Sequence, residues 1–188
     1  MCNFIRSAIL LLLFTVTFIT AQDKSAEDSL KVGDPAPTFS LPDLENNYVF
    51  LRDYCGAELR KPWINKTKHV VVLSFFATWC APCKKEIPFL EKLMDEYEGK
   101  PIKFYLIDVG EDPEKIRQFI NKSDVRLPVL IDRYMRTADK YGATALPRLA
   151  VIDKEGRIIK LERGFSNGPE FISGMRALLS RHIVESSD

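Results

Sequence analysis

Two cysteines, Cys80 and Cys83, stand two residues apart in the stretch FFATWCAPCKKEIPFL, residues 75–90. Such a pair can form a redox couple, supply half of a metal site, or contribute two small buried side chains. The pair lies where an apolar run ends and a helical pattern begins. Cys80 would therefore meet the unpaired N–H groups and the positive dipole end of a helix, which favour the reactive thiolate.

A helix starting at Cys80 would hold Cys83 nearly one turn further on, within reach of the first sulfur and more buried. The expected arrangement is an exposed attacking thiol and a sheltered resolving thiol. Lys84 and Lys85 add positive charge beside the pair, while Trp79 and Pro82 crowd a helix start in a way that two plain core cysteines would not require. These features favour the redox interpretation.

A structural zinc site is the main alternative for the pair. Zinc normally takes four ligands, often from two Cys-X-X-Cys pairs or from one pair and two spaced histidines. The chain has one such pair and two histidines, His69 and His182, whose positions fit ordinary partly exposed side chains. A non-enzymatic metal-binding or docking module remains an alternative, which the metal content of reduced protein would identify.

The elements that would position the pair alternate between strands and helices. Residues 69–77, HVVVLSFFA, are typical of a strand buried on both faces and therefore central in a sheet. Residues 35–54 predict a hairpin with its turn at Asn46–Asn47, and residues 53–68 predict a loop. Further strands are predicted at 102–109 and 127–132 and in a hairpin over 149–162, and helices at 80–98, 111–123, 133–142 and around 171–179. This order predicts an α/β fold, with a central mixed β-sheet flanked by helices and an N-terminal β-hairpin extension.

The first 34 residues differ in composition from the rest of the chain. Residues 1–21 hold one charge, Arg6, and a 14-residue apolar run that is short for a membrane span, so they predict a signal peptide cleaved before Gln22, with an uncleaved anchor as the alternative. Residues 22–34 predict a flexible linker, and residues 35–185 predict one domain. Without Arg6 the chain has 26 basic and 26 acidic side chains, which gives no reason to expect a nucleic-acid partner.

Four segments together resemble the TlpA/ResA-like thiol-disulfide oxidoreductases of the thioredoxin superfamily: PAPTFSLPDL, VVLSFFATWCAPCKKEIPFL, IDVGED and YGATALPRLAVIDKEGRI. The resemblance covers roughly residues 33–182. It implies a thioredoxin fold and thiol-disulfide exchange through a Cys80–Cys83 disulfide. It also implies a periplasmic or extracytoplasmic protein, exported or membrane-tethered, in an oxidising compartment where disulfides persist.

The resemblance also assigns roles outside the pair. It makes Pro147 the proline that follows a cis peptide bond and faces the cysteines, and the Leu146 backbone beside it could pair with an extended substrate strand. Glu86 matches a glutamate that influences the thiols in this family, although a solvated helix glutamate is the alternative. Thioredoxin itself has a buried aspartate where this chain has Ser74, so Glu86 is the only candidate proton acceptor for Cys83.

The implied activity is that of a protein-disulfide oxidoreductase, more a reductant than an oxidant because Ala81–Pro82 contains no histidine to stabilise the thiolate further. No flavin, nicotinamide or metal is needed. Expected partners are protein disulfides or dithiols, with apocytochrome c as one example, and a membrane electron-relay protein that supplies electrons. A thiol peroxidase of the peroxiredoxin type is a weaker alternative, because that site's Pro and Thr positions hold Leu73 and Ala77.

Cys55 has no counterpart in the resemblance. It lies in the predicted 53–68 loop, which would be an insertion before the central strand. A buried, unreactive side chain is the favoured interpretation because free cysteines are often buried. A third thiol that exchanges with Cys80 is the alternative.

Overall fold

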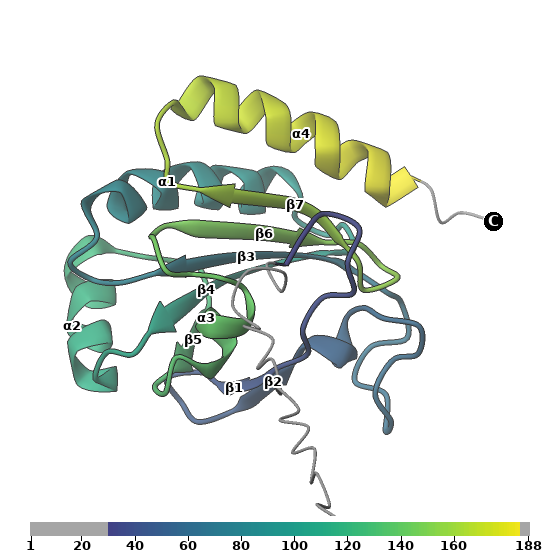
Figure 1. Ribbon diagram of the computed structural model, residues 1–188, viewed down its shortest axis with the longest axis horizontal. Coiled ribbons are helices and arrows are strands. Elements are labelled where there is room, and N and C mark those ends of the chain that lie inside the picture. Colours follow the sequence, from purple (N-terminus) through teal and green to yellow (C-terminus); the bar gives the residue numbers. More distant parts are fainter. Residues whose placement is uncertain (1–29, 185–188) are drawn as a thin grey trace, which may run out of the picture.

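The computed structural model describes residues 30–184 (Figure 1). The predicted signal peptide, residues 1–21, and most of the predicted linker lie outside the described residues. The element order is close to the sequence prediction, and a mixed α/β fold is confirmed. None of the helices in this described part has the length and apolar content needed to cross a membrane.

One five-stranded sheet, in the order β5-β4-β3-β6-β7, forms the centre of the molecule. The predicted central strand is confirmed: every residue of β3 is buried, and it pairs in parallel with β4 and antiparallel with β6. The β4–β5 pair is parallel and the β6–β7 pair is antiparallel, so the sheet is mixed. The strands are β3 (Val70–Phe76), β4 (Ile102–Val109), β5 (Val129–Asp132), β6 (Arg148–Ile152) and β7 (Ile158–Arg163).

Two apolar cores form because alternate residues of the buried strands point to opposite faces of the sheet. Val70, Val72 and Phe76 of β3 belong to one core, and Leu73 and Phe75 to the other. The first core includes apolar side chains of the helices α1 (Ala81–Glu96), α2 (Pro113–Ser123) and α4 (Gly168–Val184). The second includes α3 (Arg136–Lys140) and the N-terminal hairpin, so helices cover both faces of the sheet (Figure 1).

The N-terminal hairpin is confirmed. Strands β1 (Ser40–Pro42) and β2 (Tyr48–Phe50) pair antiparallel around a turn in which Asn46 has φ 66°. The Asp43 side chain holds this turn, since its Oδ1 accepts hydrogen bonds from the backbone N–H groups of Glu45 and Asn47 at 2.9 and 2.8 Å.

The third helix is shorter than the sequence pattern predicts. The sequence predicts a helix over residues 133–142, but α3 spans only Arg136–Lys140. The carboxylate of Asp132 accepts the backbone N–H groups of Thr137 and Ala138 at 2.8 and 2.7 Å. These bonds fix the first turn at this point, and the preceding residue, Met135, has the left-handed conformation that begins it.

Candidate active site

The two cysteines lie at the start of α1, at the end of the sheet where β3 stops. Cys80 is the N-cap of α1, and a disulfide joins it to Cys83 with a Cα–Cα distance of 5.3 Å. The backbone N–H of Cys83 donates a hydrogen bond to Sγ of Cys80 at 3.2 Å. The helix start therefore presents its N–H groups to this sulfur, the arrangement that stabilises a thiolate there after reduction.

Exposure differs from the sequence prediction at this pair. Cys80 is 3% exposed and Cys83 1% exposed, so the predicted contrast between an exposed and a sheltered thiol is wrong for the disulfide-bonded form. Both cysteines belong to the apolar core that side chains of α1 help to form. The neighbouring Trp79 is the exposed residue at this turn, with 68% of its surface accessible.

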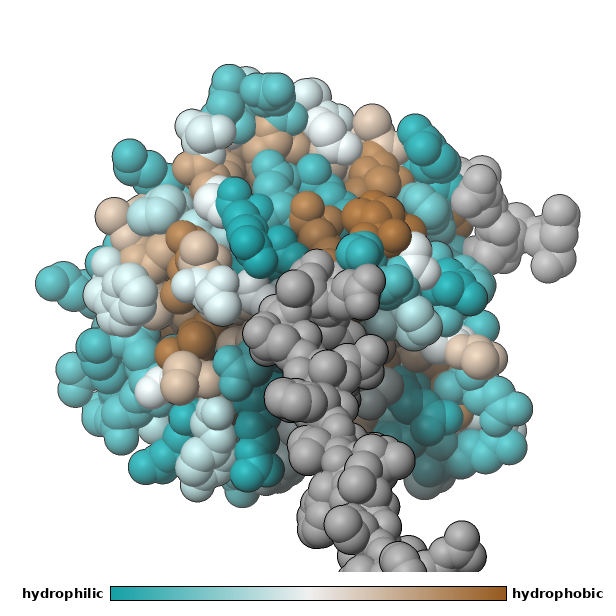
Figure 2. All heavy atoms as spheres, in the orientation of Figure 1, coloured by the Kyte–Doolittle hydropathy of each residue, from teal (hydrophilic) through white to brown (hydrophobic). Residues whose placement is uncertain are grey.

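A groove of about 620 Å³ opens beside Cys80. Trp79, Cys80 and Pro82 line one side, and Ala145 and Leu146 line the other. The Leu146–Pro147 peptide bond is cis, as the resemblance implies, and Leu146 lines the same groove as Cys80. Figure 2 shows apolar side chains gathered at this end of the molecule, at the left of the view.

Glu86 lies one helical turn after Cys83 and is only 1% exposed, so its interpretation as a solvated helix glutamate is wrong. The hydroxyl of Ser74, on β3, donates a 2.6 Å hydrogen bond to Oε2 of Glu86. Burial raises the pKa of Glu86 to about 7, against a smaller opposing effect of the Ser74 hydrogen bond, and the negative charge of Glu162 adds to the increase. Ser74 and Glu86 thus together form a buried acid beneath the first turn of α1.

A second glutamate, Glu111, holds the turn that leads to Cys80. Oε1 of Glu111 accepts the Thr78 hydroxyl at 2.8 Å and Oε2 accepts the Thr78 backbone N–H. Lys115 lies 2.5 Å from the same carboxylate. Burial would raise the pKa of Glu111, but the bonds from Lys115 and Thr78 outweigh it and the pKa is lowered, so this carboxylate stays charged.

Two aspartates complete this acidic cluster behind the turn. Asp108 lies next to the last residue of β4 and accepts the backbone N–H of Glu111 at 2.9 Å. Burial together with the charges of Glu111 and Asp132 raises the pKa of Asp108 to about 7. The sequence interpretation missed Asp108, Glu111 and Asp132. An available signal was that IDVGED and LPVLID each end a parallel strand with an acid, and parallel strands end at the same sheet edge.

Cys55 lies in a different environment, in the second core on the other face of the sheet. It is a free cysteine, 1% exposed, and burial raises the pKa of its thiol to about 12. The predicted burial of this side chain is confirmed, and its lack of reactivity stays a prediction. Within residues 30–184, no three His, Cys, Asp or Glu side chains are grouped so that they could hold a metal ion.

Comparison with known proteins places the chain in a family. The Redoxin family model matches residues 31–179. The thiol-disulfide oxidoreductase ResA of Geobacillus thermodenitrificans is 32% identical over 161 residues, which cover 85% of this chain and 86% of that protein. ResA of Bacillus cereus is 31% identical over 140 residues, or 74% of each chain, and ResA of Bacillus subtilis is 29% identical over 163 residues, or 86% and 84%.

Solved structures with the same fold support this relation. A putative thiol:disulfide interchange protein DsbE from Chlorobium tepidum superimposes with a TM-score of 0.70 at 24% identity, over 82% of this chain and 99% of that one. A putative protein disulfide isomerase from Bacteroides thetaiotaomicron gives a TM-score of 0.67 at 26% identity, over 80% and 91%. These neighbours are thioredoxin-fold proteins, and the chain belongs to the Redoxin family as a thiol-disulfide oxidoreductase related to ResA.

Proposed function

We propose that this thiol-disulfide oxidoreductase is an extracytoplasmic reductase of protein disulfides, with Cys80 as the attacking and Cys83 as the resolving thiol. The observation that carries the proposal is the position of the Cys80 sulfur, capping α1 in a groove that also contains Leu146. A thiolate there is stabilised by the helix start and can be reached by an extended substrate segment.

The reaction transfers two electrons in two exchange steps. The Cys80 thiolate attacks one sulfur of the substrate disulfide, forms a mixed disulfide, and releases the other substrate sulfur as a thiolate that takes up a proton. The Cys83 thiolate then attacks Sγ of Cys80, which closes the Cys80–Cys83 disulfide and releases the second substrate sulfur. The substrate is reduced to a dithiol and the enzyme is oxidised.

Glu86 is proposed to exchange a proton with Cys83 during the second step. Its carboxyl is buried under the helix turn that carries Cys83, and its pKa of about 7 lets it gain or lose a proton near neutral pH. Its charge would also oppose a second negative charge on the dithiol. We therefore expect the reduced enzyme to stay unreactive until a partner docks.

Trp79 and Pro82 are proposed to shape the groove around the attacking sulfur, and the Leu146 backbone next to cis-Pro147 to pair with substrate. The groove is lined mainly by apolar residues, which suits an unfolded protein segment better than a small charged thiol. Apocytochrome c, with its Cys-X-X-Cys-His haem-attachment site, is the proposed substrate class.

The extracytoplasmic location rests on the sequence of residues 1–21, whose short apolar run is typical of an export signal. A reductase in an oxidising compartment must be reduced again after each turnover. A membrane protein that relays electrons from the cytoplasm through its own dithiol is the proposed source.

The reduction potential of the Cys80–Cys83 pair tests the direction of electron flow. Equilibration with dithiothreitol or glutathione buffers should give a potential near that of thioredoxin, about −270 mV, and a value near the roughly −120 mV of a strong oxidant would contradict the proposal. The reduced enzyme should also reduce an oxidised Cys-X-X-Cys-His peptide faster than it reduces hydrogen peroxide. The opposite preference would favour the peroxidase alternative.

A further inference from the structure

The loop of residues 54–69 lies at the end of the sheet opposite the disulfide. It leads into the first residue of β3, whereas Cys80 follows the last residue of that strand. The backbone N–H of Gly56 bonds the carbonyl of Lys154 at 3.0 Å, in the turn between β6 and β7. Figure 1 shows this loop at the right of the view, away from the start of α1.

The base of the loop is tied firmly to the domain. The Arg60 guanidinium pairs with the buried carboxylate of Asp53 at 2.6 Å, and the Asn65 side chain donates to the Asp53 carbonyl at 2.9 Å. The backbone N–H of His69 donates to the Tyr54 carbonyl at 2.7 Å. These bonds hold both arms of the loop to the domain, and residues 61–68 are called the tip below.

Large apolar side chains at this tip face the solvent. Trp63 is 60% exposed and Ile64 65% exposed, although the domain has two well-filled cores that could bury such residues. Val32, at 62% exposed, lies near the same end, because the neighbouring Gly33 N–H bonds the carbonyl of Ile158 at the start of β7. Exposed aromatic and aliphatic side chains gathered in one place are typical of a surface that contacts a membrane or another protein.

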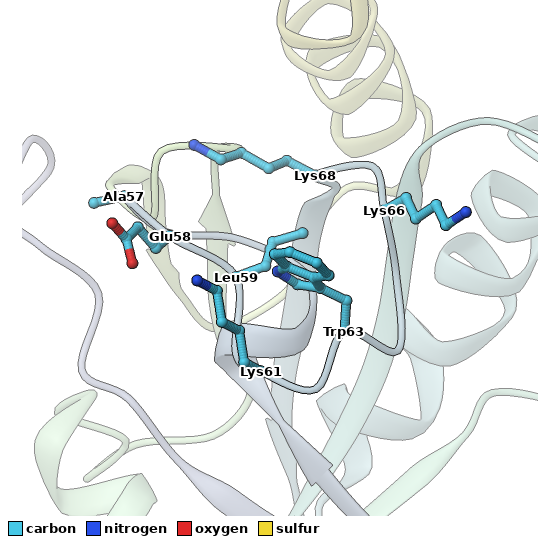
Figure 3. A pocket seen from close by; sticks show the side chains of 7 residues that line it. All are labelled: Ala57, Glu58, Leu59, Lys61, Trp63, Lys66 and Lys68. Carbon is cyan, nitrogen blue, oxygen red and sulfur yellow. The ribbon is translucent and has the colours of Figure 1, made fainter.

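Three lysines, Lys61, Lys66 and Lys68, are among the residues that line a hollow of about 460 Å³ at this tip. Figure 3 shows Leu59 and Trp63 side by side with Lys61 next to them, while the Lys66 side chain is directed away from the Trp63 ring. The Lys61 amino group lies 5.3 Å from the centroid of the Trp63 ring. Glu58 is the one acid of the lining, and no ion pair within residues 30–184 involves these three lysines.

We propose that this basic-aromatic tip, residues 61–68, docks on the surface of an anionic phospholipid bilayer. An apolar floor with a cationic rim is complementary to a lipid that joins an acyl chain to a negatively charged headgroup. Tryptophan favours the headgroup region, and each lysine near an anionic surface contributes attraction. Docking by this end would leave the Cys80 groove facing away from the membrane.

The path of the chain agrees with this orientation. Described residues begin at Leu30, and the Ala36 N–H bonds the carbonyl of Gly156 at 2.8 Å, at the same end of the sheet as the tip. The described chain therefore enters the domain at the end of the sheet where the tip lies.

The two tryptophans of the chain provide the test, because one lies at each end and both are exposed. In the full chain, Trp79→Phe leaves Trp63 as the only tryptophan, and Trp63→Phe leaves Trp79. Each variant is mixed with vesicles of phosphatidylglycerol or of phosphatidylcholine. We expect Trp63 emission to move to shorter wavelength and to be quenched by brominated lipid in phosphatidylglycerol vesicles, while Trp79 emission stays unchanged.

Charge variants test the cationic rim. Replacing Lys61, Lys66 and Lys68 with Gln in the Trp79→Phe chain should weaken the Trp63 response to phosphatidylglycerol roughly 100-fold, at about fivefold per lysine. Replacing Lys92, Lys122 and Lys140 removes the same charge from exposed positions outside the tip and should change it little. Dithiol oxidation kinetics of both variants, measured without lipid, verify that they are folded.

Several results would overturn the proposal. One is an equal Trp63 response to both lipids, and another is a response of Trp79 in place of Trp63. Equal weakening by the two lysine sets would mean that overall charge, not the tip, attracts the protein. An identical Trp63 response to soluble glycerol phosphate would identify a small-anion site in place of a membrane contact.

Discussion

Residues 30–184 hold cysteines in two buried environments, which differ in almost everything except exposure. Cys80 and Cys83 are 3% and 1% exposed, and Cys55 is 1% exposed. Cys80 caps a helix, accepts a backbone N–H and lines a groove. Cys55 belongs to the second apolar core, its thiol donates to the carbonyl of Leu51, and burial raises the pKa of this thiol to about 12.

The comparison teaches that burial alone does not decide whether a cysteine reacts. What separates the sites is the surrounding polarity: a helix start and two glutamates on one side, apolar side chains on the other. Glu86 lies beneath Cys83 and Glu111 braces the turn before Cys80. Substitutions at these positions should therefore change the reactivity of the pair to different extents.

Loss of the attacking sulfur should have the largest effect. Cys80→Ser should lower the rate of disulfide reduction by roughly 10³-fold or more, because a hydroxyl cannot replace the thiolate nucleophile. Cys55→Ala should leave the rate within about twofold, since its thiol does not take part. Turnover of a fluorescent disulfide substrate by both variants measures this contrast. A comparable loss of rate in the two variants would contradict the distinction between the two cysteine environments.

Removal of the buried Glu86 charge should change the pH dependence. A folded-state pKa of about 7, above the ordinary 4.5, means that wild-type stability falls as pH rises from about 4.5 to 7, by up to about 3 kcal/mol for this group. Glu86→Gln should remove that part of the slope and move the Cys80 thiolate titration to lower pH. Denaturant unfolding at pH 5 and 8 and thiolate absorbance measure the two effects.

Glu98→Gln, at an exposed position just beyond the end of the same helix, is the matched control for Glu86. It should reproduce the wild-type pH dependence. If both variants gave the wild-type curves, Glu86 would have no electrical influence on the pair.

Loosening the turn before Cys80 should have a smaller effect. Glu111→Gln keeps the shape of the side chain but loses the charged partner of Thr78 and Lys115, which should cost about 1–3 kcal/mol of stability. A less firmly held Cys80 should also exchange roughly tenfold more slowly. Glu114→Gln, an exposed change in α2, should change neither the stability nor the exchange rate. Identical behaviour of the two variants would show that Glu111 does not hold the turn before Cys80.

The smallest expected signal is the labelling of Cys55 in the native, reduced protein. At pH 8 a thiol with a pKa of about 12 is ionised in roughly one molecule in 10⁴, and its burial excludes the reagent. Iodoacetamide followed by mass spectrometry should therefore modify Cys80 and leave Cys55 unlabelled until the protein is denatured. Native labelling of Cys55 at a similar rate would contradict the inert environment.

Much of the fold could be predicted because local patterns and packing agree. The run at residues 69–77 is apolar throughout because β3 is buried on both faces, and Asp112 with Pro113 begins α2 as their types predict. The length of α3 could not be predicted, since it depends on the hydrogen bond that the Thr137 backbone N–H donates to the Asp132 carboxylate. A hydrophobic period does not report such a bond.

The residue types of the site could be predicted, but the burial of its side chains and the contacts between them could not. The spacing and context of the pair identified Cys80 and Cys83, and the resemblance added Glu86 and Pro147. The burial of Glu86 against Ser74, and the hold of Glu111 on Thr78, both join segments brought together only by the sheet. No regular spacing of residues in the sequence reveals contacts of this kind between separate strands and helices.

Trapping of mixed disulfides tests the central assignment most directly. Cys83→Ser removes the resolving thiol, so a substrate attacked by Cys80 should stay bound through a disulfide and appear as a shifted band on non-reducing gels. The double variant with Cys55→Ala should trap equally well, and Cys80→Ser should trap nothing. Equal adducts from the Cys80 and Cys83 variants, or adducts that vanish with Cys55→Ala, would contradict the account.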